Sequence, residues 1–489
     1  MKFSLKAIMI FLGPLTFIIL KALGHPESMP PAAWDVLCIT IWMALWWVTE
    51  AVPIAVTALL PIVLFPLTGA LAIGATTAAY GDKFVFLYLG GFLLAIAIEK
   101  WELHRRIALS IIKLIGTNLK RIILGFMIAT AFLSMWISNT ATSVMMLPIG
   151  AAIISQLQEN PATERNERKV FGKALMLAIA YSASIGGIGT LIGTPPNLVL
   201  AGIVEKLYGI EITFYQWIKL GLPISILLLA ICWKYLTSVA FDLKGMKLPG
   251  GRNEISKLLK DLGRISRQEK IVLTVFVLTA LGWITRSFLL QPLVPFIDDT
   301  IIAMTAGIAL FVLPSGKDKG RILVWEDTTR IPWGIIILFG GGMALAKAFG
   351  ETGLAVWIGE QLTDLENLPL ILLVLVLVAA VNFLTEVTSN LATTAMLLPI
   401  LAPMAVAMNI HPFFLLVAAT LAASCAFMLP VATPPNAVVF GSGHLQIKDM
   451  VRTGIWMNMI SILLITLIIY FLLPLLWGIN VDEIPAVFE

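Results

Sequence analysis

Two short clusters of hydroxyl and amide side chains interrupt an otherwise apolar chain. Residues 138–149 read SNTATSVMMLPI and residues 389–400 read SNLATTAMLLPI, identical at 8 of 12 positions. Serine, threonine and asparagine offer neutral oxygens, which a hard cation such as sodium accepts as ligands, and polar hydrogens, which bind a carboxylate. The same residue types cap helices, so a purely structural role for either cluster alone is the alternative.

A second motif, TPPN, follows each cluster, at residues 194–197 and 433–436, inside a long apolar stretch. Two consecutive prolines remove two backbone donors and disfavour helix at the residue before them. We therefore expect Thr194 and Thr433 to end one half-helix and Pro195 and Pro434 to begin another. At such a break the freed carbonyls suit a cation, and the freed N–H groups suit a carboxylate.

The composition defines the elements that must position these motifs. Of the 489 residues, 59% are hydrophobic and 13% are charged, which is typical of a polytopic membrane protein. The three cysteines, Cys38, Cys232 and Cys425, lie in apolar segments and indicate neither a disulfide framework nor a metal cluster. The net charge of +4 does not suggest nucleic acid as a partner, because the basic residues are distributed by membrane side.

Eleven apolar stretches are long enough to cross the bilayer, at about 20 residues each. The first has no small-residue cleavage site after it, so we read it as a first span with a cytoplasmic N-terminus. The eleven are residues 5–23, 33–50, 51–72, 84–103, 170–206, 216–241, 270–289, 299–314, 332–349, 411–441 and 453–477.

Two further apolar stretches, near residues 121–158 and 366–408, are interrupted by the SN clusters and are predicted to be re-entrant hairpins. With that assignment, 26 of the 33 lysines and arginines fall in loops on one side, which the positive-inside rule makes the cytoplasm. The C-terminus then lies outside. Making either stretch a full crossing would destroy this charge asymmetry, so one hairpin is expected to open inward and the other outward.

An SN cluster followed by a TPPN motif occurs twice in the chain, and an odd number of predicted membrane crossings separates the two copies. The second copy is therefore inverted relative to the first, a signature of transporters whose binding site lies where the repeats meet.

Residues 99–116 are amphipathic and predict an interfacial helix. Residues 242–269 are polar, contain Pro249, Gly250 and Gly251, and predict a cytoplasmic linker with a short helix between the halves.

The paired motifs, together with WWVTEAVPIAVTALLPI at residues 46–62, resemble the divalent anion/sodium symporters (the DASS or INDY family) over essentially the whole chain. The resemblance implies an all-α polytopic fold with about 11 transmembrane helices, two re-entrant hairpins and an inverted repeat. It also implies a homodimer with an elevator mechanism. The scaffold domain would comprise residues 1–116 and 245–360, and the transport domain residues 117–244 and 361–489.

The resemblance also assigns site residues. One sodium ion would use Ser134, Ser138, Asn139 and Gly193, and a second would use Thr385, Thr388, Asn390 and Ala432. The substrate carboxylates would meet Ser138, Asn139, Thr140, Ser389 and Asn390, with Thr194 and Thr433 nearby. Sodium acts as a coupling ion, and no other cofactor is implied. Many bacterial members of the family have SNT in both clusters, but in this sequence the second cluster has Leu391 in the threonine position. Leucine cannot donate a hydroxyl hydrogen bond. We therefore expect the two hairpin tips to bind the two ends of the substrate unequally.

Two acids lie near membrane depth. Glu386 adjoins the second cluster, and an intramembrane acid is a functional candidate by default, for example as a proton relay. We favour the alternative that its carboxylate is hydrogen-bonded at a helix start or lies at the mouth of the outward hairpin, because the equivalent position in the first copy is the apolar Met135. Glu50 is expected to be structural.

These observations predict sodium-coupled import of C4-dicarboxylates such as succinate, malate or fumarate across a bacterial inner (plasma) membrane. The alternatives are a sodium-independent dicarboxylate exchanger, or a carrier of citrate, sulfate or another divalent anion. An intramembrane hydrolase would need a nucleophile with a positioned base, and no histidine or lysine adjoins the serines at depth. The chain is therefore not expected to be an enzyme.

Overall fold

The computed structural model describes residues 5–116, 118–157, 166–243, 251–316, 320–361 and 368–480, together with 485 and 488. Within this part of the chain the fold is entirely helical apart from one isolated bridge between Pro314 and Arg321, so the predicted all-α class is confirmed. Eight helices are long and apolar enough to cross a membrane, and further apolar helices are shorter. The count of eleven crossings stays a prediction.

Most helices of the first half lie within the predicted spans, with the exceptions given below. A π-helical turn, Leu236–Ala240, continues the last of them. They are α1 (Leu5–Leu23), α2 (Pro31–Thr49), α3 (Ile54–Thr57), α4 (Leu60–Thr68), α5 (Ile73–Ala78), α6 (Lys83–Lys100), α7 (Leu103–Ile115), α8 (Leu119–Ser134), α9 (Asn139–Ser155), α10 (Glu167–Ile188), α11 (Pro195–Tyr208) and α12 (Phe214–Tyr235), with a short 3-10 turn, Ala79–Gly81, before α6.

The second half begins with α13, the short helix expected in the linker; residues 244–250 of that linker lie outside the described part of the chain. The helices of this half are α13 (Gly251–Asp261), α14 (Arg267–Thr285) with its π-turn Arg286–Leu290, α15 (Asp299–Val312), a 3-10 turn Trp325–Arg330, α16 (Trp333–Glu351), α17 (Leu354–Glu360), α18 (Leu370–Leu384), α19 (Asn390–Ala407), α20 (Phe413–Ala423), α21 (Pro434–Gly441), α22 (Ile447–Leu467) with its π-turn Ile468–Leu472, and α23 (Leu473–Trp477).

The repeat extends beyond the two motifs. Three successive helices begin at one constant offset from their counterparts: α7 and α17 at positions 103 and 354, α8 and α18 at 119 and 370, and α9 and α19 at 139 and 390. The helices that follow the two TPPN threonines begin at positions 195 and 434, a slightly shorter offset. The unit from the amphipathic helix to the broken helix therefore occurs twice with little change in the hairpins.

Two expectations about helix ends were wrong. The single span expected over residues 51–72 is divided into α3 and α4, because Pro53 and Pro61 each fit only the start of a helix and Glu50 ends α2 in a left-handed conformation. The half-helices before TPPN end earlier than the threonines, at Ile188 and Ala423. Thr194 and Thr433 are extended instead, with φ of −142° and −141°, and precede the next helix.

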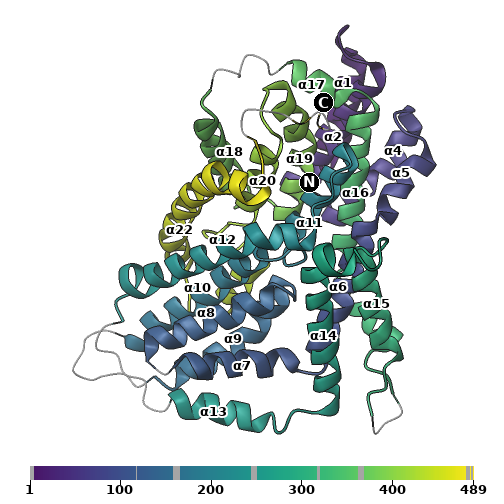
Figure 1. The fold of residues 1–489 in the computed structure, drawn as a ribbon. Helices are drawn as coiled ribbons and strands as arrows, with labels where there is room; N and C mark the ends of the chain where they lie inside the picture. Colours follow the sequence, from purple (N-terminus) through teal and green to yellow (C-terminus); the bar gives the residue numbers. More distant parts are fainter. Residues whose placement is uncertain are drawn as a thin grey trace.

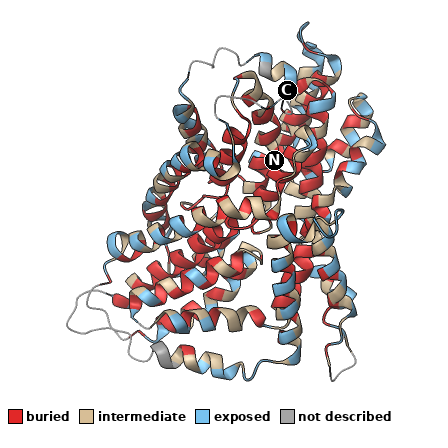
Figure 2. Cartoon of the chain, viewed as in Figure 1, coloured by how far each residue is buried: buried red, intermediate tan, exposed pale blue. Residues whose placement is uncertain are grey.

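The helices group on two sides of the molecule. In Figure 1, α1, α2, α4–α6 and α14–α16 lie on one side, α8–α10, α12, α18, α20 and α22 lie on the other, and α11 and α19 lie between them against α16. α10 is the most enclosed long helix, and Figure 2 shows it buried along its length. α7 and α13, which the domain prediction assigns to the scaffold, lie beside α8 and α9. The assignment of scaffold and transport domains stays a prediction.

The two repeats are intertwined around the breaks. α9 of the first hairpin packs against α21 of the second repeat, and α19 of the second hairpin packs against α11 of the first. Each SN cluster, at the start of α9 or α19, is thus brought next to the TPPN helix of the opposite copy. In both cases helix packing joins segments that lie in different halves of the sequence.

Ion pairs join segments that the charge pattern assigns to the same side. On the predicted cytoplasmic side, three pairs link different loops: Lys100 with Asp327 at 2.6 Å, Arg106 with Glu269 at 2.6 Å, and Lys173 with Asp449 at 2.5 Å. On the opposite side, Lys83 pairs with Glu205 at 2.7 Å, and Arg286 pairs with both Glu211 and Asp299. The loops that the hairpin assignment groups together therefore contact one another.

Candidate sodium and substrate site

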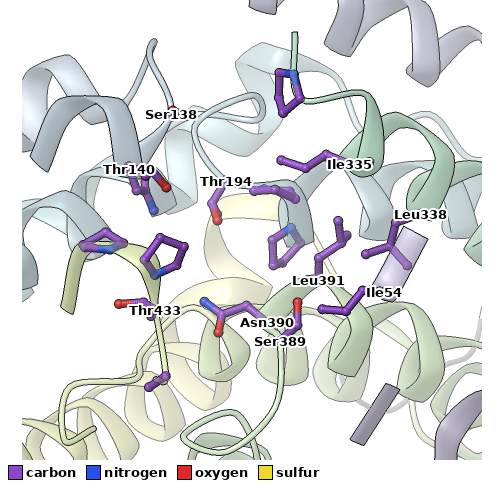
Figure 3. A pocket seen from close by; sticks show the side chains of 18 of the residues that line it. Ile54, Ser138, Thr140, Thr194, Ile335, Leu338, Ser389, Asn390, Leu391 and Thr433 are labelled. Atoms are coloured by element: carbon purple, nitrogen blue, oxygen red, sulfur yellow. The ribbon is translucent and has the colours of Figure 1, made fainter. Parts of the chain in front are cut away.

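A cavity of about 930 Å³ lies where the two repeats meet. Both SN clusters and both TPPN motifs line it, and Figure 3 places Thr140, Thr194 and Thr433 around the same space as Ser389 and Asn390. The opposite wall is apolar and is formed by Ile54, Ile335 and Leu338 of the other helix group, with Leu391 beside them. The site therefore has one face of hydroxyl and amide groups and one face of aliphatic side chains.

Charged groups are nearly absent from this cavity. Of the described residues that line it, Glu50 is the sole acid, and none is a lysine, arginine or histidine. A bound dianion would meet polar hydrogens and backbone dipoles but no side-chain cation. Its charge would have to be offset by something other than the protein's own basic residues.

Beneath the first tip, three neutral oxygens crowd together. The Ser134 hydroxyl lies 2.5 Å from Asn139 Oδ1 and 2.7 Å from the Ala183 carbonyl. One hydroxyl hydrogen serves two acceptors here, so the oxygens outnumber the available donors. Gly187 makes this arrangement possible, because a Cβ at that position would lie 2.8 Å from Asn139 Oδ1 and 3.0 Å from the Gly193 carbonyl.

Beneath the second tip the same cluster recurs with Thr385 in place of serine. The Thr385 hydroxyl lies 2.7 Å from Asn390 Oδ1 and 3.1 Å from the Ala423 carbonyl. Thr388 is close by and shares a 2.6 Å hydrogen bond with Thr393. Two equivalent oxygen clusters thus flank the cavity, each built from a hairpin tip and a half-helix end.

The asparagine of each TPPN motif holds its break together. The Asn197 amide donates to the carbonyls of Gly187 and Thr190, at 3.2 and 2.8 Å. The Asn436 amide donates to the carbonyls of Ala426 and Leu429, at 3.3 and 3.0 Å, in the same relative positions. These bonds satisfy carbonyls that the interrupted helix leaves without partners.

The two tips differ in which hydroxyls are already engaged. Ser138 caps α9 by accepting from the Ala141 N–H at 3.2 Å, whereas Ser389 makes no side-chain cap bond. At the breaks the pattern reverses: Thr433 accepts from the Asn436 N–H at 3.3 Å, and Thr194 makes no such bond. The hydroxyls left uncommitted by capping are therefore Ser389 on one tip and Thr194 on the opposite break.

Glu386 has a structural set of partners. Its carboxylate is 3% exposed. It accepts four hydrogen bonds, from the N–H groups of Phe427, Met428 and Leu429 at 2.7, 3.0 and 3.0 Å and from the Asn458 side-chain amide at 2.8 Å. Glu386 is hydrogen-bonded, as expected, but its backbone donors lie in the segment between α20 and α21 and not at a helix start. Glu50, which is expected to be structural, ends α2, is exposed and lines the cavity.

The structure brings together every residue that the sequence proposed for the site. Ten line the cavity, and Ser134 and Thr385 lie directly behind it through their bonds to Asn139 and Asn390. The ten are Ser138, Asn139, Thr140, Gly193, Thr194, Thr388, Ser389, Asn390, Ala432 and Thr433. Sequence reasoning missed Gly187 and the roles of Asn197 and Asn436, although the recurrence of asparagine in both TPPN copies was a visible signal.

Comparison with known proteins gives the family. The model of the sodium:sulfate symporter transmembrane region matches residues 4–479. The chain belongs to the sodium:sulfate symporter family. Relatives include the sodium-dependent dicarboxylate transporters SdcS of Staphylococcus saprophyticus, 48% identical over 480 residues, and of Staphylococcus aureus, 49% identical over 482 residues; each alignment covers 97% of this chain and 92% of the relative.

Solved structures support the fold of this symporter. The YdaH transporter of Alcanivorax borkumensis aligns with a TM-score of 0.57 at 12% identity, covering 95% of this chain and 97% of that one. The antimetabolite efflux pump MtrF of Neisseria gonorrhoeae aligns with a TM-score of 0.57 at 14% identity, covering 93% and 98%. The family consists of transporters, so the resemblance drawn from the motifs and the expectation that the chain is not an enzyme are both confirmed.

Proposed function

We propose that this symporter carries C4-dicarboxylates, such as succinate, malate or fumarate, into the cell together with sodium ions. The observation that carries the proposal is the pair of equivalent oxygen clusters flanking one cavity that has no lysine, arginine or histidine among its described lining residues. Sodium ions bound at the clusters supply the positive charge that a dianion needs there. The names of the staphylococcal relatives support both the ion and the substrate class.

The first sodium ion is bound by Ser134, Ser138, Asn139 and Gly193, and the second by Thr385, Thr388, Asn390 and Ala432. The substrate carboxylates meet the polar hydrogens of Ser138, Asn139, Thr140, Ser389 and Asn390, with Thr194 and Thr433 at the breaks. Support comes from their convergence on one cavity and from the short oxygen–oxygen distances behind each tip. With more sodium charge than substrate charge, each net positive charge gains about 2.3 kcal/mol per 100 mV on import.

Transport proceeds by an elevator movement in a homodimer of the plasma membrane, with residues 117–244 and 361–489 moving against residues 1–116 and 245–360. The N-terminus is cytoplasmic and the C-terminus external. The cavity extends to Pro332, which precedes α16 and follows the basic loop at residues 317–330, and to Glu50, which follows α2 and which the predicted topology places on the same side. That position supports a cavity open to the cytoplasm in this state.

The deciding experiment measures uptake of labelled succinate into proteoliposomes with and without an inward sodium gradient. Sodium-coupled symport predicts uptake that requires the gradient and is stimulated by an inside-negative potential. Uptake that is indifferent to sodium and requires internal dicarboxylate would identify an exchanger instead. Competition by unlabelled malate, fumarate, citrate and sulfate, each with and without sodium, ranks the substrates.

A further inference from the structure

Glu386 is a buried carboxyl group without a cationic partner. All four of its hydrogen-bond partners are donors, three backbone N–H groups and one amide, so both of its side-chain oxygens act as acceptors. Among the described lysines and arginines, none forms an ion pair with it. A charge removed from water without a counter-charge is costly, even when hydrogen bonds surround it.

The position equivalent to Glu386 in the first repeat, at the offset that relates the two hairpins, is Met135, and it makes the same kind of link without a charge. There the Thr190 hydroxyl donates to the Met135 carbonyl at 2.5 Å, and the Met135 side chain packs against Gly189. Leu429, the counterpart of Thr190 at the offset that relates the two TPPN motifs, donates its N–H to Glu386. Both repeats therefore tie the hairpin tip to the break at matching residues, and only the second uses a carboxylate.

The carboxylate is connected to both sides of the second oxygen cluster. Glu386 follows Thr385 directly in sequence, and the Thr385 hydroxyl is 2.7 Å from Asn390 Oδ1. Its partner Leu429 accepts through its carbonyl from the Ala432 N–H at 3.2 Å. Thr385, Asn390 and Ala432 are proposed ligands of the second sodium ion, so the Glu386 carboxyl group lies one residue from one of them and is hydrogen-bonded to the segment that carries another.

We propose that Glu386 is the fixed counter-charge of the second sodium ion, and that the two sodium sites consequently differ in affinity. This inference rests on the proposed sodium-coupled function. The second site, next to an ionised carboxylate in a region shielded from water, binds sodium more tightly than the first, which has Met135 in the same place. The second ion therefore binds before the first as sodium concentration rises.

The test measures thermal unfolding of the purified protein against sodium concentration, with choline replacing sodium at constant ionic strength. Glu386→Gln, which removes the charge and keeps the shape, is expected to raise the sodium concentration at half-maximal stabilisation at least tenfold. Met135→Leu is the matched control in the first repeat and is expected to leave that concentration within twofold of the wild type. A folded Glu386→Gln protein with the wild-type sodium dependence would overturn the proposal.

Glu386→Asp separates the charge from the positioning of the break. Aspartate keeps the carboxylate, but its shorter side chain does not reach the same donors, so we expect a lower melting temperature in choline. We expect the sodium concentration at half-maximal stabilisation to stay within threefold of the wild type. This variant also carries the test if Glu386→Gln does not fold. A tenfold rise in Glu386→Asp would mean that the residue acts only by holding the peptide segment. A wild-type protein with neither sodium-dependent stabilisation nor sodium-driven uptake would instead refute the proposed function.

Discussion

At the scale of single residues, the site is a set of matched pairs with a few mismatches. Asn139 and Asn390 each accept a hydrogen bond, through the side-chain oxygen, from the hydroxyl of the residue five positions earlier in the sequence. By contrast, Ser138 is used as a cap and Ser389 is not, and Thr140 is replaced by Leu391. The matched pairs indicate what both repeats must do, and the mismatches indicate where the two ends of the substrate are treated differently.

Asn139→Ala and Asn390→Ala are each expected to weaken sodium binding at least tenfold, because each removes an amide oxygen from one cluster and leaves the neighbouring hydroxyl with a changed partner. The measurement is the sodium dependence of succinate uptake in proteoliposomes. Asn166→Ala is the control: Asn166 caps the start of α10 and is not among the residues that line the cavity. This substitution should lower stability without changing the sodium dependence. Unchanged sodium dependence in both site variants would contradict their proposed role as ligands.

Leu391→Thr is expected to change substrate preference. Leu391 is 5% exposed and adjoins the aliphatic wall of Ile54 and Leu338. A hydroxyl there adds a polar contact, so affinity for malate or citrate should rise about tenfold relative to succinate, within the range that one substrate hydroxyl contact contributes. Competition against labelled succinate measures this ratio, and Ile335→Thr, which adds a hydroxyl on the scaffold wall instead, tests whether the position matters. Equal effects of the two substitutions would argue against unequal gripping by the tips.

At the scale of elements, the broken helices determine the site. α10 and α20 end before the TPPN motif, and the intervening segment is held by Asn197 in one repeat and Asn436 in the other. Small residues let the hairpin tip approach this segment closely. The half-helix ends therefore contribute carbonyl oxygens to the clusters only if no side chain intrudes between tip and break.

Gly187→Ala tests this close approach. A Cβ on Gly187 would lie 2.8 Å from Asn139 Oδ1, so the substitution should displace the amide and reduce sodium affinity about tenfold or more. Helix propensity alone favours alanine over glycine by about 1 kcal/mol, so a loss identifies the steric effect. Gly350→Ala in α16, whose nearest neighbour would be 3.7 Å away, is the matched control for sodium-dependent thermal stabilisation. Wild-type sodium affinity in Gly187→Ala would show that the first cluster does not need this geometry.

At the scale of the whole molecule, the two helix groups are joined by ion pairs of the buried Arg286 on the side opposite the basic loops. Arg286 of the predicted scaffold is 1% exposed; its guanidinium lies 2.8 Å from Glu211 of the predicted transport domain and 3.0 Å from Asp299. Asp299 also accepts from the Phe214 N–H at 2.9 Å. An elevator movement would have to break the Glu211 and Phe214 contacts.

Arg286→Met is expected to destabilise the protein by about 3–5 kcal/mol, because it leaves Asp299 buried without its cation. The measurement is thermal unfolding in detergent together with uptake. Lys347→Met is the control: its partner Glu351 is exposed and 3.6 Å away, so the loss should be below about 1 kcal/mol. Equal melting temperatures for the two variants would mean that the buried pair contributes no more than a surface pair.

The sequence by itself determined the features that depend on local chemistry. Proline pairs interrupt helices wherever they occur, so the breaks before α11 and α21 could be predicted from TPPN, and serine before an apolar run predicted the tips at Ser138 and Ser389. The recurrence of both motifs gave the inverted repeat. The exact ends of α10 and α20 could not be predicted, because they depend on partners that are distant in the sequence, such as Glu386.

Only the tertiary structure decided which groups meet. The packing of α9 on α21 and of α19 on α11 brings the two clusters to one cavity, and no sequence pattern fixes such contacts between the two halves of the chain. Packing inside each repeat places Glu386 against three backbone N–H groups in the second copy and Met135 against Gly189 in the first. A buried polar group takes its role from the partners that surround it, and those partners are assembled by the fold.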